Sequence, residues 1–422
     1  MRDKFILHLP PRNSRWVYYQ IFLVMVMFWL RDSVGIPSSI TYLTDIITFC
    51  LLIKNIKRIR KTIFAAGANI PWLIVCLIVV CMLFGALINT VSPVLVLWAI
   101  RNNLRFFAFL FICITVLSVE DIDNLISFIK KFFWINVLMC SYQYFVKGLS
   151  GDYIGGFFGN TQGCNAYVNV FLCIVCAVII GQFFVGKIKI YQMILYLLSG
   201  LYIASLAELK IFYVEFIIML IVALIFARPS IKTVIICFVG IIGFVVGINL
   251  VMRYSPQSLA IFTDQEVRDF YLSGNGYTNS GDLNRFTAIQ QISKSFFSGD
   301  LLKQLFGFGL GSCEYASFEF LQSSFSKQYS YLHYRWFTHA WVYLEQGAVG
   351  LGLLTLFIIA LILWAVFHRK SSRPDLIMTS VMFLTTCLLG MIYNCALEIE
   401  ACYLIALVAA IPFVVIKYEK NE

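Results

Sequence analysis

Twelve long apolar runs follow one another along this chain, and polar segments separate them. Each run has roughly 17–25 residues, the length at which an α-helix crosses the hydrocarbon core of a bilayer. Sixty per cent of the 422 residues are hydrophobic and only 13% are charged, which is more apolar surface than a soluble fold can bury. The sequence predicts an all-α polytopic membrane protein with about 12 transmembrane helices, near residues 16–30, 34–53, 70–92, 97–118, 125–146, 166–186, 190–206, 211–227, 232–252, 339–367, 376–396 and 401–416.

Basic residues in the short loops predict the orientation of these helices. The net charge is +10, and most Lys and Arg residues fall on one side of the predicted bundle, which the positive-inside rule assigns to the cytoplasm. Both termini are then expected inside. No cleavable secretory signal is visible, because the first run lacks a small-residue cleavage site and the second follows directly. Loop topology accounts for the charge, so no nucleic-acid partner is inferred.

One segment is far longer than the other connections and divides the chain. We expect spans 1–9 within residues 1–252, a large loop outside the cytoplasm at 253–338, and spans 10–12 within 339–422. Within the loop, 283–297 has the spacing of an amphipathic helix, and 314–325 is a second candidate. The glycine run at 307–311 lacks the Lys-Ser/Thr of a phosphate loop and is expected to form a turn between two loop helices.

A second outer loop, residues 147–165, is rich in glycine, which favours tight turns or close approach of the backbone to a ligand. The 13 cysteines show no metal-binding spacing, so no metal site is predicted. Only Cys164 and Cys313 fall in the predicted outer loops. These two could form a disulfide in an oxidising compartment, or stay free.

The tenth span begins with a histidine followed by polar residues at helical spacing. His339, Tyr343, Gln346 and Gly350 occupy positions i, i+4, i+7 and i+11, which lie on one stripe of a helix. Such a stripe fits one wall of a wet cleft that opens at the outer surface. An interfacial histidine with a tyrosine of the aromatic belt explains the same pattern equally well.

Arginine within a span is a stronger signal, because it is costly there and is usually paired or functional. Arg101 and Arg105 lie on one face near the outer end of the fourth span, within reach of a lipid diphosphate. Snorkelling to headgroups, or pairing with a carboxylate such as Asp45 or Glu215, is the alternative. Three further cations fall on the same side of the membrane: Lys210, Arg285 and Arg335.

Taken together, these motifs resemble the bacterial O-antigen polymerase and O-antigen ligase superfamily. The resemblance covers most of the chain through short, degenerate motifs, which are Arg285 heading a loop helix, the Gly307/Gly309/Gly311 turn, His339 and the run Glu345-Gln346-Gly347-Ala348-Val349-Gly350. Gly156-Phe157-Phe158-Gly159-Asn160 and Asn165 are similar to the family's loop before a span. Two positions depart from the family pattern: Ala340 stands where Asn is usual, and Lys210 stands where Arg is common.

The resemblance implies glycosyl transfer from an undecaprenyl-diphosphate-linked glycan, outside the cytoplasm, in a protein of the bacterial inner membrane. It implies His339 and Arg285 as catalytic residues, with His339 as the base. Cations would hold the diphosphate without a metal or other cofactor. The residues expected to bind the diphosphate are Arg101, Arg105, Lys210 and Arg335, and those expected to line the cleft are Tyr343, Gln346 and Glu345.

Within this superfamily the sequence favours a polymerase that extends lipid-linked repeat units over a ligase that transfers the glycan to the lipid A core. Membrane lipids are expected partners, and a chain-length regulator and a flippase can be others. A transporter or lipid-linked oligosaccharide flippase is the alternative of another class. No repeated half of the kind many transporters have is evident, and the one long outer loop makes the layout asymmetric.

Overall fold

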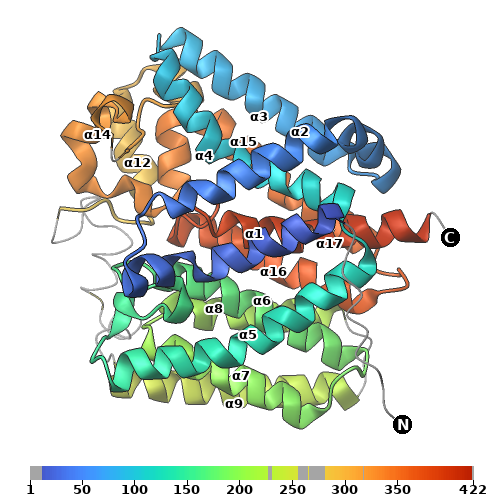
Figure 1. The fold of residues 1–422 in the computed structure, drawn as a ribbon. Coiled ribbons are helices and arrows are strands. Elements are labelled where there is room, and N and C mark those ends of the chain that lie inside the picture. The colour runs from blue at the N-terminus through green and yellow to red at the C-terminus, as the bar shows by residue number, and fades with distance from the viewer. Residues whose placement is uncertain (1–11, 227–230, 255–264, 266–280, 317, 421–422) are drawn as a thin grey trace.

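The computed structural model describes residues 12–226, 231–254, 265, 281–316 and 318–420, and this part of the chain is helical without a β-strand. Helices cover the twelve apolar runs, and Figure 1 shows them as one bundle. Their bounds are α1 Arg12–Trp29, α2 Ile40–Ala66, α3 Asn69–Ile88, α4 Pro93–Val116, α5 Val119–Phe145, α6 Asn165–Phe184, α7 Ile190–Leu206, α8 Lys210–Phe226, α9 Ile231–Tyr254, α15 Thr338–Phe367, α16 Pro374–Tyr393 and α17 Cys402–Glu419.

The number of crossings differs from the prediction of twelve. Within the described residues, eight helices are long and apolar enough to cross a membrane: α1 with the π-turn after it, α3, α4, α5, α6, α15, α16 and α17. The second half of α2 carries five basic residues within 54–61, and α7 and α8 have 17 residues each, which is the lower limit of the length that crosses a bilayer. The all-α membrane architecture is supported, and the count of twelve spans is not.

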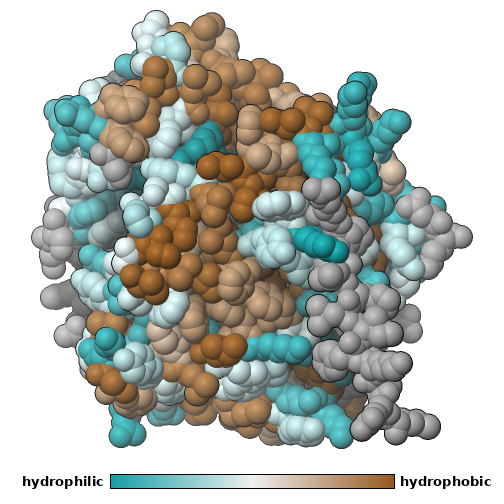
Figure 2. Space-filling model, viewed as in Figure 1, coloured by the Kyte–Doolittle hydropathy of each residue, from teal (hydrophilic) through white to brown (hydrophobic). Residues whose placement is uncertain are grey.

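The bundle has a central group of helices and a lipid-facing periphery. Helices α6 and α17 are buried along almost their whole length, and α17 packs against α4, α16 and α2. In Figure 1, α1, α16 and α17 lie between a group containing α3, α4 and α15 and a group containing α5 to α9. Figure 2 shows apolar side chains gathered over the middle of one face, with hydrophilic side chains toward its two ends. This distribution suits a protein surrounded by lipid at mid-height.

The long loop that the sequence predicts outside the cytoplasm, called the outer loop below, has its own apolar cluster in its described part. Short helices α12 (Ala288–Ile292) and α14 (Ser324–Tyr329) and a π-helix at Ser293–Phe297 pack apolar residues with the first turns of α15. A third short helix, α13 (Leu301–Phe306), contacts α15 outside this cluster. Figure 1 shows α12 and α14 at the end of the bundle opposite the C-terminal end of α17.

Both helices predicted in this loop are placed differently in the structure. The first begins at Ala288 rather than 283, because the side chain of Asn284 accepts a hydrogen bond from the Phe286 amide and holds a turn there. The predicted helix at 314–325 is wrong. That stretch contains one short 3₁₀ turn at Glu319–Leu321, and α14 begins only at Ser324, capped by the Ser323 hydroxyl.

The glycine run 307–311 is inserted into the bundle and does not simply join two loop helices. A Cβ at Gly307 would lie 2.5 Å from the Leu344 carbonyl oxygen, and one at Gly309 would lie 2.7 Å from that of Gly85. The run therefore threads between α15 and α3 by backbone contact. Gly347 makes the reciprocal approach, because its φ of 64° kinks α15 and brings its backbone against that of Leu305 in α13.

We expect Gly347→Ala to destabilise the protein by about 1–3 kcal/mol, because the new Cβ meets the Leu305 backbone at a positive φ. The measurement is the thermal unfolding midpoint of the protein in detergent. Gly352→Ala, five residues further along the same helix, is the matched control, since a Cβ there meets nothing within 4 Å. Equal midpoints for the two variants would show that the kink does not require glycine.

Candidate functional site

A buried arginine in the middle of α4, rather than near the end where the sequence placed it, organises the polar interior of the bundle. The Arg105 side chain is 5% exposed and forms ion pairs with Glu400 Oε1 at 3.1 Å and Asp45 Oδ1 at 3.9 Å. It also donates to the backbone carbonyl of Glu398. These contacts are the carboxylate pairing that the sequence left open as an alternative. They engage both terminal nitrogens of Arg105 within the protein.

The two carboxylates that pair with Arg105 are fixed by tyrosines from other helices. Tyr167 Oη of α6 donates to Glu400 Oε2 at 2.8 Å, and Tyr403 Oη of α17 donates to Asp45 Oδ1 at 2.7 Å. Burial acts to raise the pKa of Glu400, but Arg105 and the hydrogen bonds outweigh it and hold that pKa below its usual range. Glu400 is therefore a carboxylate in the folded protein. Four helices and the 394–401 connection meet at this pair.

Glu215, the other carboxylate considered for the arginines, lies elsewhere. It accepts hydrogen bonds from Asn169 Nδ2 at 2.8 Å and Cys173 Sγ at 3.2 Å, both on α6. The pairing of Arg101 or Arg105 with Glu215 is thus wrong, because α8 meets α6 and α16 rather than α4. Asp45 is the partner because α2 packs along α4.

Arg101 is more accessible than Arg105, with 26% of its side chain exposed. Its guanidinium lies 3.9 Å from the ring centre of Trp98 and 5.0 Å from that of Tyr42. One nitrogen is 3.4 Å from Asp45 Oδ2, and another donates to Asn102 Oδ1 at 2.6 Å. The faces of two aromatic rings thus contact the Arg101 guanidinium, and part of its side chain stays exposed.

Glu314 of the outer loop is a part of the site that sequence reasoning missed. It is fully buried, and Asn102 Nδ2 donates to both of its carboxylate oxygens at 3.0 and 3.1 Å. Burial raises the pKa of Glu314, and the nearby Arg335, Arg101 and Arg105 only partly offset this. The polar run Arg101-Asn102-Asn103 within a span was the available signal. No sequence pattern indicated its partner more than 200 positions away.

Arg335 and Arg285 are held mainly by aromatic rings. The Arg335 guanidinium lies 4.6 Å from the ring centre of Trp341 and 5.1 Å from that of Tyr315. The Arg285 guanidinium lies 4.1 Å from the ring centre of Tyr393 and 5.2 Å from that of Phe337. Among the described residues, neither has a carboxylate within ion-pair distance.

Four arginines have one feature in common, a buried Nε–H group without a hydrogen-bond acceptor among the described residues. The Nε–H groups of Arg101, Arg105, Arg285 and Arg335 are buried and find no acceptor among the described residues. Buried N–H groups without a protein partner are uncommon, and ordered water or a bound ion can supply the acceptor. Arg285, Arg335 and Arg101 are each partly exposed, so an oxyanion could reach their guanidinium groups.

His339, the predicted base, is a buried junction between the loop and α16. One ring nitrogen lies 2.9 Å from the Arg285 carbonyl oxygen and the other 3.1 Å from the Met391 carbonyl oxygen. A neutral imidazole has one N–H, so it can donate to only one of these carbonyls. The ring therefore positions the backbone of Arg285. Its role as a base stays a prediction and requires one ring nitrogen to exchange a carbonyl for substrate.

The predicted polar stripe on α15 does not form one wall of a wet cleft. Tyr343 is buried against Phe297 with ring centres 5.3 Å apart, and Glu345 accepts the Cys313 amide at 2.9 Å. Gln346 donates to Asn103 Oδ1 at 2.8 Å. The expectation of a wet cleft was wrong because the outer loop packs onto this face, and the kink at Gly347 ends the regular spacing before Gly350.

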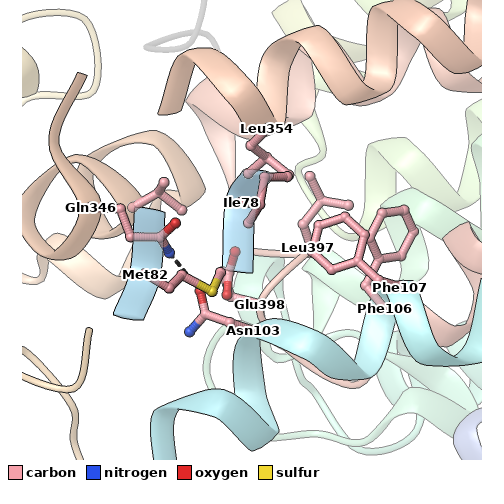
Figure 3. A pocket seen from close by; sticks show the side chains of 10 residues that line it. Ile78, Met82, Asn103, Phe106, Phe107, Gln346, Leu354, Leu397 and Glu398 are labelled. Carbon is pink, nitrogen blue, oxygen red and sulfur yellow. Dashed lines mark hydrogen bonds between the residues drawn. The ribbon is translucent and has the colours of Figure 1, made fainter. Parts of the chain in front are cut away.

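A small, mostly apolar cavity lies beneath this face, between α3, α4 and α15. Figure 3 shows Gln346 and Asn103 joined across it, with Glu398 beside Met82 and the rings of Phe106 and Phe107 further along the lining. Burial raises the pKa of Glu398 to about 8, with Glu314 adding to the shift and Arg105 opposing it. Glu398 thus carries a proton at neutral pH, unlike Glu400 two residues away.

The remaining predicted cation and the glycine-rich loop meet at another place on the bundle. Lys210 is exposed at the first residue of α8, in the turn whose Glu208 carboxyl packs against Gly151. The loop is held by Gln143, which accepts from the amides of Gly155 and Gly156 and donates to the carbonyl of Gly159. We find no contact that brings Lys210 to the arginines among the described residues.

The chain matches no protein-family model and no curated protein. Among the described residues, no group of three or more His, Cys, Asp or Glu side chains is arranged to hold a metal ion. Cys164 and Cys313 are both free thiols, so the disulfide that the sequence left open does not form in this structure. The functional argument therefore rests on the geometry of the arginines and their partners.

Replacing Arg105 by methionine should destabilise the fold by roughly 3–5 kcal/mol, because the largely buried Glu400 carboxylate loses its counter-charge and Asp45 keeps only Arg101. Thermal unfolding in detergent measures this. Adding Asp45→Asn and Glu400→Gln to Arg105→Met should restore part of the loss. Arg101→Met, in the more exposed neighbour, should cost about 1 kcal/mol or less. A milder effect for Arg105 than for Arg101 would contradict the central role of this pair.

The raised pKa of Glu398 predicts a pH dependence of stability. An unfolded chain loses the Glu398 proton near the ordinary value of 4.5, but the folded protein keeps it until about pH 8. The folded state binds the extra proton in that window, so the free energy of unfolding should fall as the pH rises through it. Glu398→Gln should flatten this slope. The measurement is thermal unfolding at about pH 5, about pH 6.5 and about pH 8, which span the window between the two pKa values. An unchanged slope would show that Glu398 ionises normally.

Proposed function

We propose that this protein is a glycosyltransferase that uses a polyprenyl-diphosphate-linked glycan as donor on the outer side of the membrane. The favoured activity is that of a surface-polysaccharide polymerase, which joins undecaprenyl-diphosphate-linked repeat units. The observation that carries the proposal is the pair of partly exposed arginines, Arg285 and Arg335, which lie on aromatic rings and have no carboxylate within ion-pair distance among the described residues. A diphosphate offers acceptor oxygens of the right charge to satisfy them.

The way these arginines are held supports an anionic ligand in particular. Aromatic rings support Arg285 and Arg335 from the side, which fixes the guanidinium without neutralising it. A carboxylate partner would compete with the ligand. Arg105 is neutralised within the protein, so we assign it the task of positioning α4 and the 394–401 segment rather than binding the diphosphate.

The reaction needs a group that stabilises the leaving diphosphate and a group that receives a proton. The acceptor sugar hydroxyl attacks the anomeric carbon of the donor, and the bond between that carbon and the diphosphate oxygen breaks. Arg285 and Arg335 hold the departing lipid diphosphate, whose negative charge grows as this bond breaks. His339 takes the hydroxyl proton once a ring nitrogen leaves its backbone carbonyl, and Arg285 moves with it because they share that hydrogen bond.

The test is synthesis of polymer by the purified protein from lipid-linked repeat units of its own host. The unaltered protein should convert them into a ladder of longer products without an added lipid A core. Arg335→Ala and Arg285→Ala should each lower the rate by about 100-fold or more, because each removes a charge-assisted contact to the leaving group. His339→Ala should also be inactive. Lys294→Ala, an exposed cation of the same loop, is the matched control and should stay active.

Other outcomes would assign a different function. Transfer only when lipid A core is supplied would indicate a ligase. Movement of lipid-linked units across the membrane without a new glycosidic bond would indicate a flippase. Full activity of both arginine variants, with unfolding midpoints like that of the unaltered protein, would contradict the proposed diphosphate site.

A further inference from the structure

The short helix α13 (Leu301–Phe306) lies against the lipid-facing side of the bundle. Its C-terminal end contacts α15 through the reciprocal approach of Gly307 to Leu344 and of Gly347 to Leu305. It also reaches α3, because the rings of Phe306 and Phe84 are 4.9 Å apart in an edge-to-face arrangement. Although α13 belongs to the outer loop in sequence, it is packed on two membrane-spanning helices.

Helix lengths place α13 at the outer boundary of the hydrocarbon core. From Ala348, just after the kink, to Phe367 at its end, α15 has 20 residues, which is about 30 Å of helix. Helix α3 also has 20 residues, and Phe84 lies close to its C-terminal end at Ile88. Since the core is about 30 Å thick, both helices are just long enough to cross it. The contacts at Gly347 and Phe84 then fall at its outer edge.

The outward side of α13 is apolar. Leu301 is 65% exposed and Leu302 is 54% exposed. On either side of them in sequence, Asp300 and Lys303 form an exposed ion pair at 3.2 Å. On the neighbouring turn of α3, Phe84 is 46% exposed and Leu87 is 77% exposed. The two leucines therefore extend the apolar surface of a membrane-spanning helix beyond its end.

We propose that α13 is a membrane-inserted anchor of the outer loop, with Leu301 and Leu302 buried in the outer phospholipid leaflet. Continuity with the lipid-facing side of α3 favours lipid as the occupant over a protein partner. The adjacent Asp300–Lys303 pair lies where the headgroup region begins, as in an interfacial amphipathic helix. This anchor holds the loop that carries Arg285 and Arg335 at a fixed height. The inference does not depend on the proposed function.

The experiment measures the surroundings of a nitroxide spin label in the full-length protein in phosphatidylglycerol–phosphatidylethanolamine vesicles. The label is attached to Leu302→Cys in a protein in which the two thiols classed as exposed among the described residues are removed by Cys50→Ser and Cys76→Ser. Accessibility to oxygen, which concentrates in lipid, is compared with accessibility to a water-soluble nickel chelate. Gln328→Cys, an exposed position on α14 in the same loop, is the matched control.

We expect the ratio of oxygen accessibility to nickel accessibility to be several-fold higher at position 302 than at position 328. In nanodiscs whose lipids carry a nickel-chelating headgroup, nickel lies at the membrane surface, so the ratio at position 302 should fall. A ratio at 302 equal to that at 328 would overturn the proposal and leave α13 in water. Low accessibility of the 302 label to both reagents would also overturn it, because it would indicate contact with protein, such as a second copy of the chain. Thermal unfolding midpoints like that of the unaltered protein establish that both labelled variants are folded.

Discussion

A charge inside an apolar bundle has to be neutralised, and this constraint organises the structure around Arg105. Its guanidinium brings together Asp45 of α2 and Glu400 of the 394–401 segment, and tyrosines of α6 and α17 complete the hydrogen bonds of those carboxylates. An uncompensated charge at this depth would cost several kcal/mol. Helices distant in sequence are therefore held in one arrangement, and the 394–401 segment has a fixed conformation beside the candidate site.

The outer loop is the second part of the site and is built into the bundle by close backbone contacts. Glycines at 307–311 and at 347 let the loop approach α3 and α15 more closely than any side chain would allow. Glu314 then reaches Asn102 of α4, and Arg335 and Arg285 come to lie on aromatic rings beside the 394–401 segment. The loop and the bundle are thus separate in the sequence, but they pack together closely in the structure.

Neighbouring carboxyl groups in this interior have opposite electrostatic roles. Glu400 is ionised because it contacts Arg105 directly, and the pKa of Glu398 is raised because its side chain lines an apolar cavity. The arginines divide in a similar way: Arg105 is satisfied within the fold, whereas Arg285 and Arg335 have aromatic neighbours and no carboxylate partner in the described part of the chain. The proposed diphosphate site rests on this difference between the arginines and not on the number of cations.

The sequence by itself determined the helical membrane architecture, because long apolar runs have few other ways to satisfy their backbone groups in a bilayer. It also singled out Arg101, Arg105, Arg285 and Arg335, since cations near apolar spans are conspicuous. Only the tertiary structure decided which of them is paired. Glu314, Glu398 and the two ring contacts of His339 escaped prediction because their partners lie 50 to more than 200 positions away, as with Glu314 and Asn102 or His339 and Met391. Periodicity reports which face of a helix a residue occupies, whereas packing decides what that face meets.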